Sequence, residues 1–339
     1  MAVKVAVAAL AAAVVALPPP TFRVQGDPLS LNGSGPRLAV VTSYCVVRVA
    51  NFASGGAPVA VRAPAPCRDP EADVATDDVW LARNSIVVQT VDAPSPHGED
   101  FGLWAGPLPR GPLGGVAEWS WTDSDVPGGY GCAWTVASGG GVIAMAPGPN
   151  TLAVDHGMDA KPACPALPDA KTRVRLLGAS RASTTVAGSW SVLATDGTRL
   201  ALASLDRDGY RTGELGLFAL DGRRLPTPKI AAATVKAAFR SWLTPEGLVV
   251  STLRGVVTPR WTVREGGDVA VGYGRVLYVN RRTLFVRRLR GGPARRVTTV
   301  PSPAALLAAG SFGVGIATGE STARVSRLPW RTIDRVLPR

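Results

Sequence analysis

Histidine is nearly absent from this 339-residue sequence, which contains only His97 and His156. A histidine general base and a histidine-ligated zinc site are therefore poorly supported, and we interpret both histidines as solvated loop residues. The sequence also lacks the Gly-x-Ser-x-Gly nucleophile elbow, the Gly-x-x-x-x-Gly-Lys-Ser/Thr phosphate loop and the His-Glu-x-x-His zinc motif. With these signatures missing, the sequence favours a protein without catalytic activity.

Charged residues are also scarce, at 18% of the chain, whereas hydrophobic residues make up 46%. Intrinsic disorder is thereby disfavoured, because a chain of this composition can bury a core. Long helix-forming segments are missing as well: apolar segments are short, rich in Val and separated by many of the 38 Gly and 29 Pro residues. Short Val-rich segments separated by Gly and Pro predict many short strands and an all-β protein.

The one long apolar run lies at the N-terminus, from Val5 to Leu17, after Lys4 and before three prolines at 18–20. A positive residue followed by an apolar stretch and small residues is typical of a secretory signal peptide. Because about 20 apolar residues are needed to cross a bilayer, we expect no membrane span. We predict a signal peptide at residues 1–16 and an exported protein, secreted or associated with the cell envelope. The alternative is an N-terminal strand or tail.

The sequence contains four cysteines, an even number, and none of them forms a Cys-x-x-Cys pair. In an exported protein this favours two disulfides over a zinc site, with buried free thiols as the alternative. Of the three pairings, the sequential one is favoured, because each pair then falls within one local block of strands and loops. We therefore predict the disulfides Cys45–Cys67 and Cys132–Cys164.

Residues 21–339 contain no polar linker or low-complexity run, so we predict a single domain there. The recurring unit is a block of four short strands joined by tight turns, which is the size of one propeller blade. The clearest block, Asp268 to Val300, has candidate strands at 269–272, 275–279, 283–286 and 296–300. Blocks begin near residues 38, 76, 132, 184, 239, 268 and 306. This pattern predicts a β-propeller of four-stranded antiparallel blades, with seven favoured over six. The alternative is a pair of β-sandwiches.

One block carries a family resemblance. Residues 194–222 combine an Asp-Gly turn at 196–197, a hydrophobic strand, an Asp-Arg-Asp-Gly turn at 206–209 and a second strand that ends in Asp-Gly at 221–222. This order resembles the repeat of TolB-like, WD40-related β-propellers. The resemblance implies a propeller fold, but no particular activity.

Aromatic residues gather in the stretch from 101 to 134, which contains four of the nine tryptophans. Asp123 and Asp125 lie close to Trp119, and carboxylates beside aromatic rings suit a glycan site, while acidic loops suit calcium. The alternative is that the acids serve ordinary β-connectors and that most tryptophans pack between blades. We take Trp104, Trp119, Asp123 and Asp125 as candidate ligand contacts. We predict no resident cofactor or metal, with calcium as the one cation that the acidic loops would suit.

The formal net charge of +12 is unevenly distributed. Residues 1–170 contain 9 Lys and Arg against 15 Asp and Glu, whereas residues 275–339 contain 13 Arg against Glu320 and Asp334. Because consecutive blades lie side by side, one side of a propeller should be basic and attract anionic envelope polymers or lipid head groups. Nucleic acid is not expected as a partner of an exported protein. The basic patch would include Arg281, Arg282, Arg287 and Arg288, and the alternative is a solvated face.

Together these features predict an exported, monomeric, non-catalytic β-propeller that binds a ligand, another protein or an envelope component through loops at one end of its channel. The first alternative is a calcium-dependent hydrolase or lactonase-type propeller, which needs inward carboxylates or Asn from several blades. Its candidates are Asp78, Asn84, Asp125, Asp155 and Asp196. The second alternative is a structural envelope protein without a small ligand.

Overall fold

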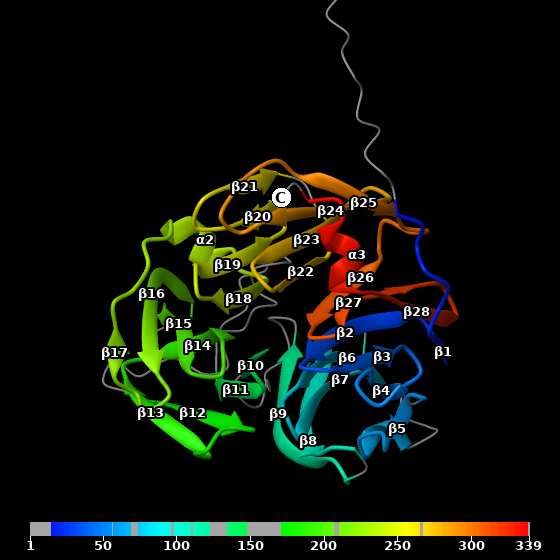
Figure 1. Cartoon of the computed structure of the whole chain (residues 1–339). Coiled ribbons are helices and arrows are strands. Elements are labelled where there is room, and N and C mark those ends of the chain that lie inside the picture. The colour runs from blue at the N-terminus through cyan, green and yellow to red at the C-terminus, as the bar shows by residue number, and fades with distance from the viewer. Residues whose placement is uncertain are drawn as a thin grey trace, which may run out of the picture.

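The structure is a computed structural model that describes residues 15–55, 57–68, 74–95, 98–109, 111–122, 134–147, 171–206, 210–264 and 267–337. Within these ranges, 28 strands form seven sheets of four antiparallel strands each, arranged as a ring (Figure 1). The predicted seven-bladed β-propeller is thereby confirmed.

Each sheet is one blade, whose strands follow one another from the channel outwards. Blade 1 contains β2 (Pro28–Ser34), β3 (Arg37–Thr42), β4 (Val47–Asn51) and β5 (Val59–Val61). Blade 2 contains β6 (Val74–Leu81), β7 (Ser85–Ser95), β8 (Gly98–Pro107) and β9 (Gly114–Thr122). Blade 3 contains β10 (Trp134–Gly139), β11 (Val142–Pro147), β12 (Lys171–Leu177) and β13 (Ser183–Ala187). Blade 4 contains β14 (Trp190–Thr195), β15 (Arg199–Leu205), β16 (Arg211–Ala219) and β17 (Arg224–Leu225).

The remaining three blades follow the same order along the chain, except at the ring closure. Blade 5 contains β18 (Arg240–Thr244), β19 (Gly247–Thr252), β20 (Gly255–Val257) and β21 (Thr262–Arg264). Blade 6 contains β22 (Val269–Gly272), β23 (Arg275–Asn280), β24 (Thr283–Arg288) and β25 (Arg295–Thr299). Blade 7 contains β26 (Leu306–Gly310), β27 (Gly313–Thr318), β28 (Thr322–Leu328) and β1 (Phe22–Gln25).

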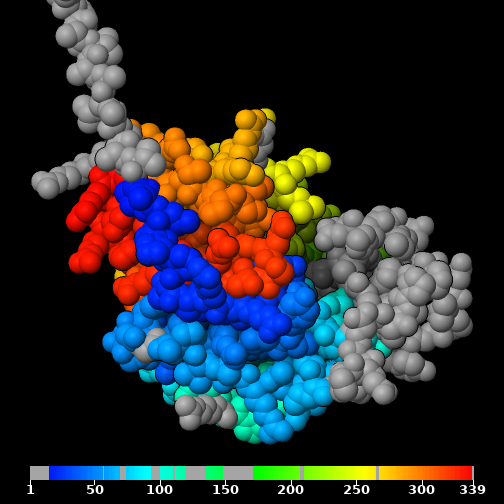
Figure 2. Space-filling model, turned by 90° about the vertical axis from the view of Figure 1, so that its right-hand side faces the viewer, coloured from blue at the N-terminus to red at the C-terminus, as the bar shows by residue number. Residues whose placement is uncertain are grey.

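The ring closes because the first strand of the chain completes the last blade. In the β1–β28 ladder, Phe22 lies opposite Val325 and Val24 lies opposite Ala323. Both Phe22 and Val24 are buried, whereas the alternate residues of β1 are exposed, as expected for a strand with one covered face. Figure 2 shows N-terminal residues, in blue, lying against C-terminal residues, in red, on this side of the molecule. The closing ladder pairs the outer edge of β28 and joins the two ends of the chain in one blade.

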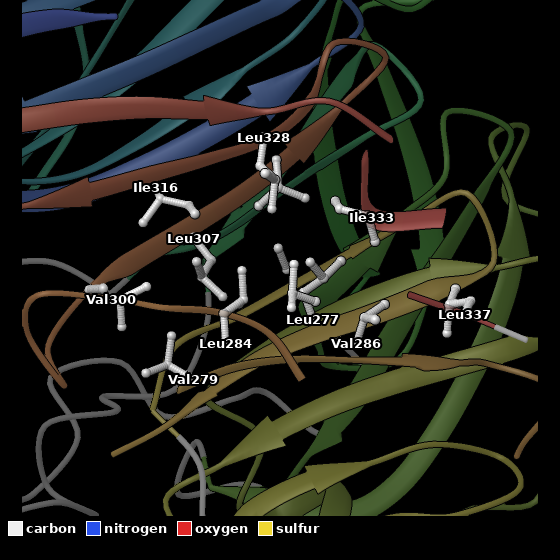
Figure 3. Close-up of a cluster of buried hydrophobic side chains, with 14 residues drawn as sticks. Leu277, Val279, Leu284, Val286, Val300, Leu307, Ile316, Leu328, Ile333 and Leu337 are labelled. Atoms are coloured by element: carbon white, nitrogen blue, oxygen red, sulfur yellow. The ribbon is translucent and has the colours of Figure 1, made fainter. Parts of the chain in front are cut away.

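Hydrophobic clusters fill the interfaces between neighbouring blades. Between blades 6 and 7, Leu277 and Leu284 meet Leu307, Ile316 and Leu328 (Figure 3). Leu277 and Leu284 are completely buried, and burying a side chain of this size contributes about 1.5–3 kcal/mol. A single blade cannot bury both of its faces, so the packing of neighbours supplies the core of each blade.

Helix is confined to short segments in the described residues. The 3₁₀ helix η1 (Pro66–Arg68) lies between blades 1 and 2, α2 (Ala232–Lys236) precedes blade 5, and α3 (Trp330–Asp334) follows β28. Val235 and Ile333 attach α2 and α3 to the neighbouring cores. In this part of the chain, no helix has the length and apolar character that a membrane span requires.

Candidate functional site

The inner strands of the seven blades surround a central cavity with a volume of about 1020 Å³. Every blade contributes to its wall, through β2, β6, β10, β14, β18, β22 and β26. Among the lining residues are three tryptophans from blades 2, 3 and 5, namely Trp80, Trp134 and Trp242. The wall also contains charged side chains from several blades, and cavities of this size are common ligand sites.

The two ends of the channel differ in the connections that they carry. Because neighbouring strands are antiparallel, the chain begins every inner strand at the same end, which we call the top face. The top face also carries the connections between the second and third strands of each blade. The opposite end, the bottom face, carries the turns between first and second strands. It also carries α3, which follows the third strand of blade 7 and lies in front of the blades in Figure 1.

Arg240, the first residue of β18, places a charge at the top end of the channel. Its Nη1 lies 3.2 Å from Oδ1 of Asp268, and its Nη2 lies 3.8 Å from Oδ1 of Asp78. Asp268 also accepts the backbone N–H of Leu307 at 2.6 Å, and Asp78 accepts the hydroxyl of Ser30. These residues come from blades 5, 6, 2, 7 and 1, so one polar network joins five blades.

Burial and charge act in opposite directions within this network. For Arg240, burial lowers the pKa, but the carboxylates of Asp78, Asp268 and Asp77 outweigh it and hold the pKa above its usual value. For Asp268, burial raises the pKa more than Arg240 and two backbone N–H groups lower it. The guanidinium therefore stays charged, while Asp268 bears the desolvation cost of the pair. Since both acids already face a cation and a donor, the network is suited to hold the blades in place.

Asp196 lies at the bottom end, in the turn that follows β14. Its Oδ1 accepts the backbone N–H groups of Thr198 and Arg199 at 2.9 and 2.8 Å, and its Oδ2 lies 2.7 Å from Nη2 of Arg199. Burial raises the pKa of Asp196, but the hydrogen bonds from Thr198 and Arg199 outweigh it and hold the pKa below 3.8. The carboxylate is thus engaged within its own turn.

The neighbouring turn of blade 3 packs directly against the turn that contains Asp196. A Cβ on Gly140 would lie 1.8 Å from the backbone oxygen of Asp196, and Gly140 has φ +57°. Only glycine fits this contact, because any side chain would overlap the carbonyl group. The turns of blades 3 and 4 are therefore in direct backbone contact at the bottom face.

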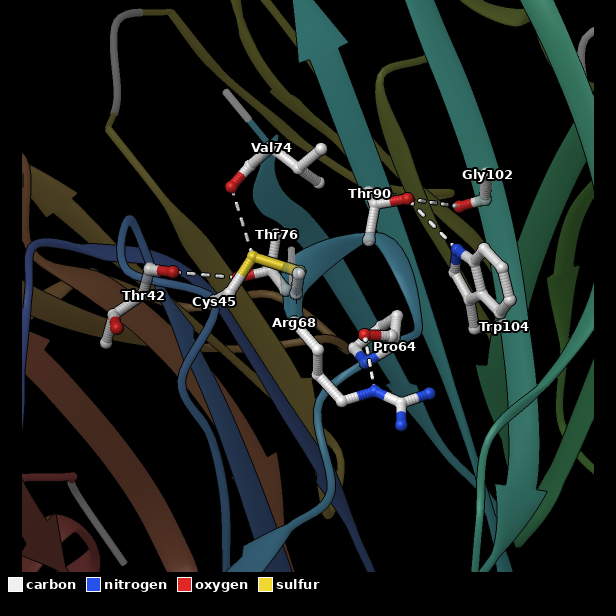
Figure 4. Close-up of a disulfide and its surroundings, with 10 residues drawn as sticks. Thr42, Cys45, Pro64, Arg68, Val74, Thr76, Thr90, Gly102 and Trp104 are labelled. Carbon is white, nitrogen blue, oxygen red and sulfur yellow. Dashed lines mark hydrogen bonds between the residues drawn. A yellow bond between two sulfur atoms is a disulfide. The ribbon is translucent and has the colours of Figure 1, made fainter. Parts of the chain in front are cut away.

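Among the predicted ligand contacts, Trp104 lies away from the channel, in the third strand of blade 2. Its Nε1 donates to Oγ1 of Thr90 at 3.0 Å (Figure 4), and its ring packs against the core between blades 1 and 2. Trp119 lies in β9, where its backbone is in register with Phe101. Asp123 and Asp125 fall outside the described residues.

The residues proposed for the calcium-dependent alternative are partly brought together. Asp78, Asn84 and Asp196 all line the cavity, whereas Asp125 and Asp155 fall outside the described residues. Asp78 lies near the top, and Asn84 and Asp196 lie in turns at the bottom. In the described part of the chain, no three His, Cys, Asp or Glu side chains gather as a metal site would require.

One of the two predicted disulfides lies within the described residues. Cys45, in the turn between β3 and β4, is bonded to Cys67 in η1, with 5.7 Å between their Cα atoms (Figure 4). The prediction Cys45–Cys67 is thereby confirmed. The bond ties the connection between blades 1 and 2 to the top face of blade 1. Cys132 and Cys164 lie outside the described residues, so their pairing stays a prediction.

The predicted basic patch is divided between the two ends of β24. Arg281 and Arg282 form the top-face turn between β23 and β24, whereas Arg287 and Arg288 are the last residues of β24, toward the bottom. The guanidinium of Arg287 lies 4.4 Å from the ring centroid of Trp261, a cation–π contact. Contact with a polyanion through these arginines stays a prediction.

Sequence reasoning missed the charges that lie at the top of the channel, Arg240, Asp268 and Arg211. A usable signal exists for the first two: Arg240 is the first residue of the inner strand β18, and Asp268 directly precedes the inner strand β22. Arg211, in contrast, belongs to the third strand of blade 4, and nothing in its local sequence indicates that it lines the cavity.

The ring of seven four-stranded blades around a channel defines the chain as a seven-bladed β-propeller. No family model and no curated protein matches its sequence. Similar solved structures include the AfRom2 CNH domain, at 8% identity and TM-score 0.46, with 93% of this chain and 98% of that chain covered. Sqt1 of Saccharomyces cerevisiae has 9% identity and TM-score 0.44, with coverages of 91% and 98%.

A further similar structure is the computationally designed Ika8 protein, at 11% identity and TM-score 0.42, with 93% of this chain and 99% of that chain covered. Likenesses at these values carry no functional inference, so the fold class is based on the sheet topology. The propeller fold implied by residues 194–222 is confirmed, and membership of the TolB-like group stays a prediction.

Proposed function

We propose that this protein is an exported, non-catalytic β-propeller that binds a protein or another envelope component through its top face. The observation that carries this proposal is the position of the exposed apolar side chains. Six large hydrophobic residues of the described chain are exposed, and five of them lie at the top end. The five are Leu29, Tyr44, Tyr210, Phe239 and Leu253, and the sixth, on the bottom face, is Tyr273.

The two most exposed of these residues lie on blade 5. Phe239 is 67% exposed and directly precedes β18, and Leu253 is 82% exposed in the turn between β19 and β20. Exposed apolar residues that gather on one face mark interaction sites more often than scattered ones do, and aromatic residues are enriched in binding surfaces. The variable connections of propellers provide such surfaces on a rigid scaffold.

Export is the second part of the proposal. A short apolar N-terminal run supports a signal peptide at residues 1–16, and a disulfide between Cys45 and Cys67 is compatible with an oxidising compartment. The intact mass of the secreted protein tests this part. Cleavage near Ala16 is expected, and recovery of the full-length chain in the cytosol would contradict export.

Binding through the top face is tested with immobilised protein and a solubilised envelope fraction. The wild type is expected to retain one envelope component, and the variant Phe239→Ser/Leu253→Ser is expected to reduce the retained amount of that component by about ten-fold or more. Tyr273→Ser is the matched control, because Tyr273 is 61% exposed on the opposite face. Equal retention by the double variant and the wild type would contradict the proposal.

The same preparation separates binding from the two alternatives. A stoichiometric calcium ion in the purified wild type would support the calcium-dependent hydrolase. Retention of no envelope component, by a protein that is itself abundant in the envelope, would support the structural role.

A further inference from the structure

Arg211 is a partly buried cation at the top of the channel. It is the first residue of β16, and its side chain reaches from blade 4 to the start of blade 5. Its Nη1 donates to the backbone oxygen of Ala238 at 2.7 Å, and its Nε donates weakly to Oγ of Ser191 at 3.4 Å. Both acceptors are uncharged, so these contacts position the guanidinium without neutralising it.

The other partly buried charges of the cavity wall, described above, have partners of opposite charge. Arg240 pairs with Asp78 and Asp268, and Asp196 pairs with Arg199. Within the described ranges, no carboxylate forms an ion pair with Arg211. Its charge is therefore unmatched by this part of the chain.

Burial makes this unmatched charge costly. It lowers the pKa of Arg211 to about 10, through desolvation alone. A charge that is removed from water without a counter-charge weakens the fold, and ionisable groups with strongly shifted pKa values cluster at functional sites. Arg211 thus combines a position on a cavity wall with a desolvation cost that the described residues do not compensate.

The surroundings of Arg211 indicate the kind of anion that fits. The two contacts leave part of its N–H donor fork unused, and a carboxylate accepts such a fork in a bidentate manner. Ala238, which accepts one of the bonds, is followed by the exposed ring of Phe239. Asp78 and Asp268 lie at the same end of the channel, so a single negative charge is tolerated better than two.

We propose that Arg211 forms a subsite for the carboxylate of an organic acid or peptide C-terminus, whose apolar group lies on Phe239. This inference rests on the proposed function, because it assigns a ligand chemistry to the same top face. The organic acid and the peptide C-terminus share the chemistry that Arg211 recognises, and the test separates them.

The test uses matched probes that differ in one charge. N-acetyl-phenylalanine is compared with its uncharged amide, by calorimetry on the full-length mature protein. The wild type is expected to bind the acid at least about ten-fold more tightly than the amide. A short peptide that ends in a free phenylalanine carboxylate, compared with the same peptide amidated, shows whether a peptide terminus is preferred to the single amino acid.

Three variants test whether the preference for the acid over the amide depends on Arg211. Arg211→Gln is expected to abolish the preference for the acid, and Arg211→Lys, which keeps the charge but not the fork, is expected to reduce it. Arg83→Gln, which removes a cation from the bottom rim, is the control and is expected to leave it unchanged. Near-ultraviolet circular dichroism verifies that each variant is folded.

Two outcomes would overturn the inference. One is equal binding of acid and amide by the wild type, which would mean that Arg211 is already neutralised. The other is a preference that survives Arg211→Gln. The two proposals can fail separately. If Phe239→Ser/Leu253→Ser still retains the envelope component, and the preference for the acid is lost in Arg211→Gln, only the proposed function is refuted. Loss of the component in that variant, with no acid preference in the wild type, refutes only the subsite.

Discussion

Arg240 and Asp268 form an ion pair between the first strands of two neighbouring blades, with 3.2 Å between Nη1 and Oδ1. The two residues are 28 positions apart in the chain, and Arg240 also reaches Asp78 of blade 2. A single guanidinium thereby connects blades on both sides of the channel. Removal of one charge leaves the others partly buried without a partner, so it should destabilise the fold more than replacement of all the charges together.

Breaking this network is expected to destabilise the protein. Arg240→Met leaves Asp268 and Asp78 buried without their cation, and the free energy of unfolding should fall by about 3 kcal/mol. Arg240→Met/Asp268→Asn should recover about 1 kcal/mol or more of that loss. Urea unfolding of the wild type, both single variants and the double variant measures the coupling. Additive losses would show that the pair contributes no coupling energy.

Asp196 is expected to contribute stability that depends on pH. Its pKa in the folded protein lies below 3.8, so its stabilisation is fully present above that value and is lost as the pH falls through the folded pKa. Asp196→Asn should cost about 1 kcal/mol at neutral pH, and the difference from the wild type should shrink below pH 3.8. Thermal unfolding as a function of pH measures this difference. A pH-independent difference would contradict the assignment to the charged carboxylate.

Closure of the ring is expected to depend on the buried face of β1. Val24→Asp places a carboxylate in the core between blades 7 and 1 and should reduce the free energy of unfolding by about 2–3 kcal/mol. Gln25→Asp, at an exposed position of the same strand, should change it by less than about 0.5 kcal/mol. Chemical denaturation compares the two variants. Equal stabilities would mean that β1 is dispensable for closure.

Both disulfides can be tested on one unreduced sample. Peptide mapping should show Cys45 bridged to Cys67 and Cys132 bridged to Cys164. Cys45→Ser/Cys67→Ser should lower the free energy of unfolding by about 2–4 kcal/mol, because the bond restricts the unfolded chain. A bridge between Cys45 and either Cys132 or Cys164 would contradict the pairing.

Polyanion binding is expected to depend on the arginines of blade 6. The protein should be retained on heparin at low salt and released at high salt. Arg281→Ser/Arg282→Ser and Arg287→Ser/Arg288→Ser alter opposite ends of β24, so each pair should lower the salt concentration needed for elution if the anion spans the strand. If replacement of all four arginines does not change the salt concentration of elution, these arginines form a solvated face and do not bind the polyanion.

Much of the blade pattern is predictable because strand signals are local. The candidate strands between 269 and 300 coincide closely with β22 to β25, where Gly-rich or Asn-Arg turns separate Val-rich segments. The predicted start near 38 falls in β3, after the inner strand β2, and the predicted start near 184 falls in β13, before the inner strand β14. The inner strand β2 contains Pro, Asn and Gly, which weaken its strand signal. The contribution of β1 to blade 7 has no local signal at all.

The all-β class, the size of the blades and the disulfide between Cys45 and Cys67 are predictable from the sequence alone, since these depend on turns, alternation and short separations. Which charged side chains meet, in contrast, depends on how the blades are arranged in space. Arg240 faces Asp78, and Arg211 reaches the start of blade 5, because closure of the ring brings the beginnings of all the inner strands around one axis. Local sequence does not encode that convergence, so the polar groups of the top face became recognisable only when the blades were placed side by side.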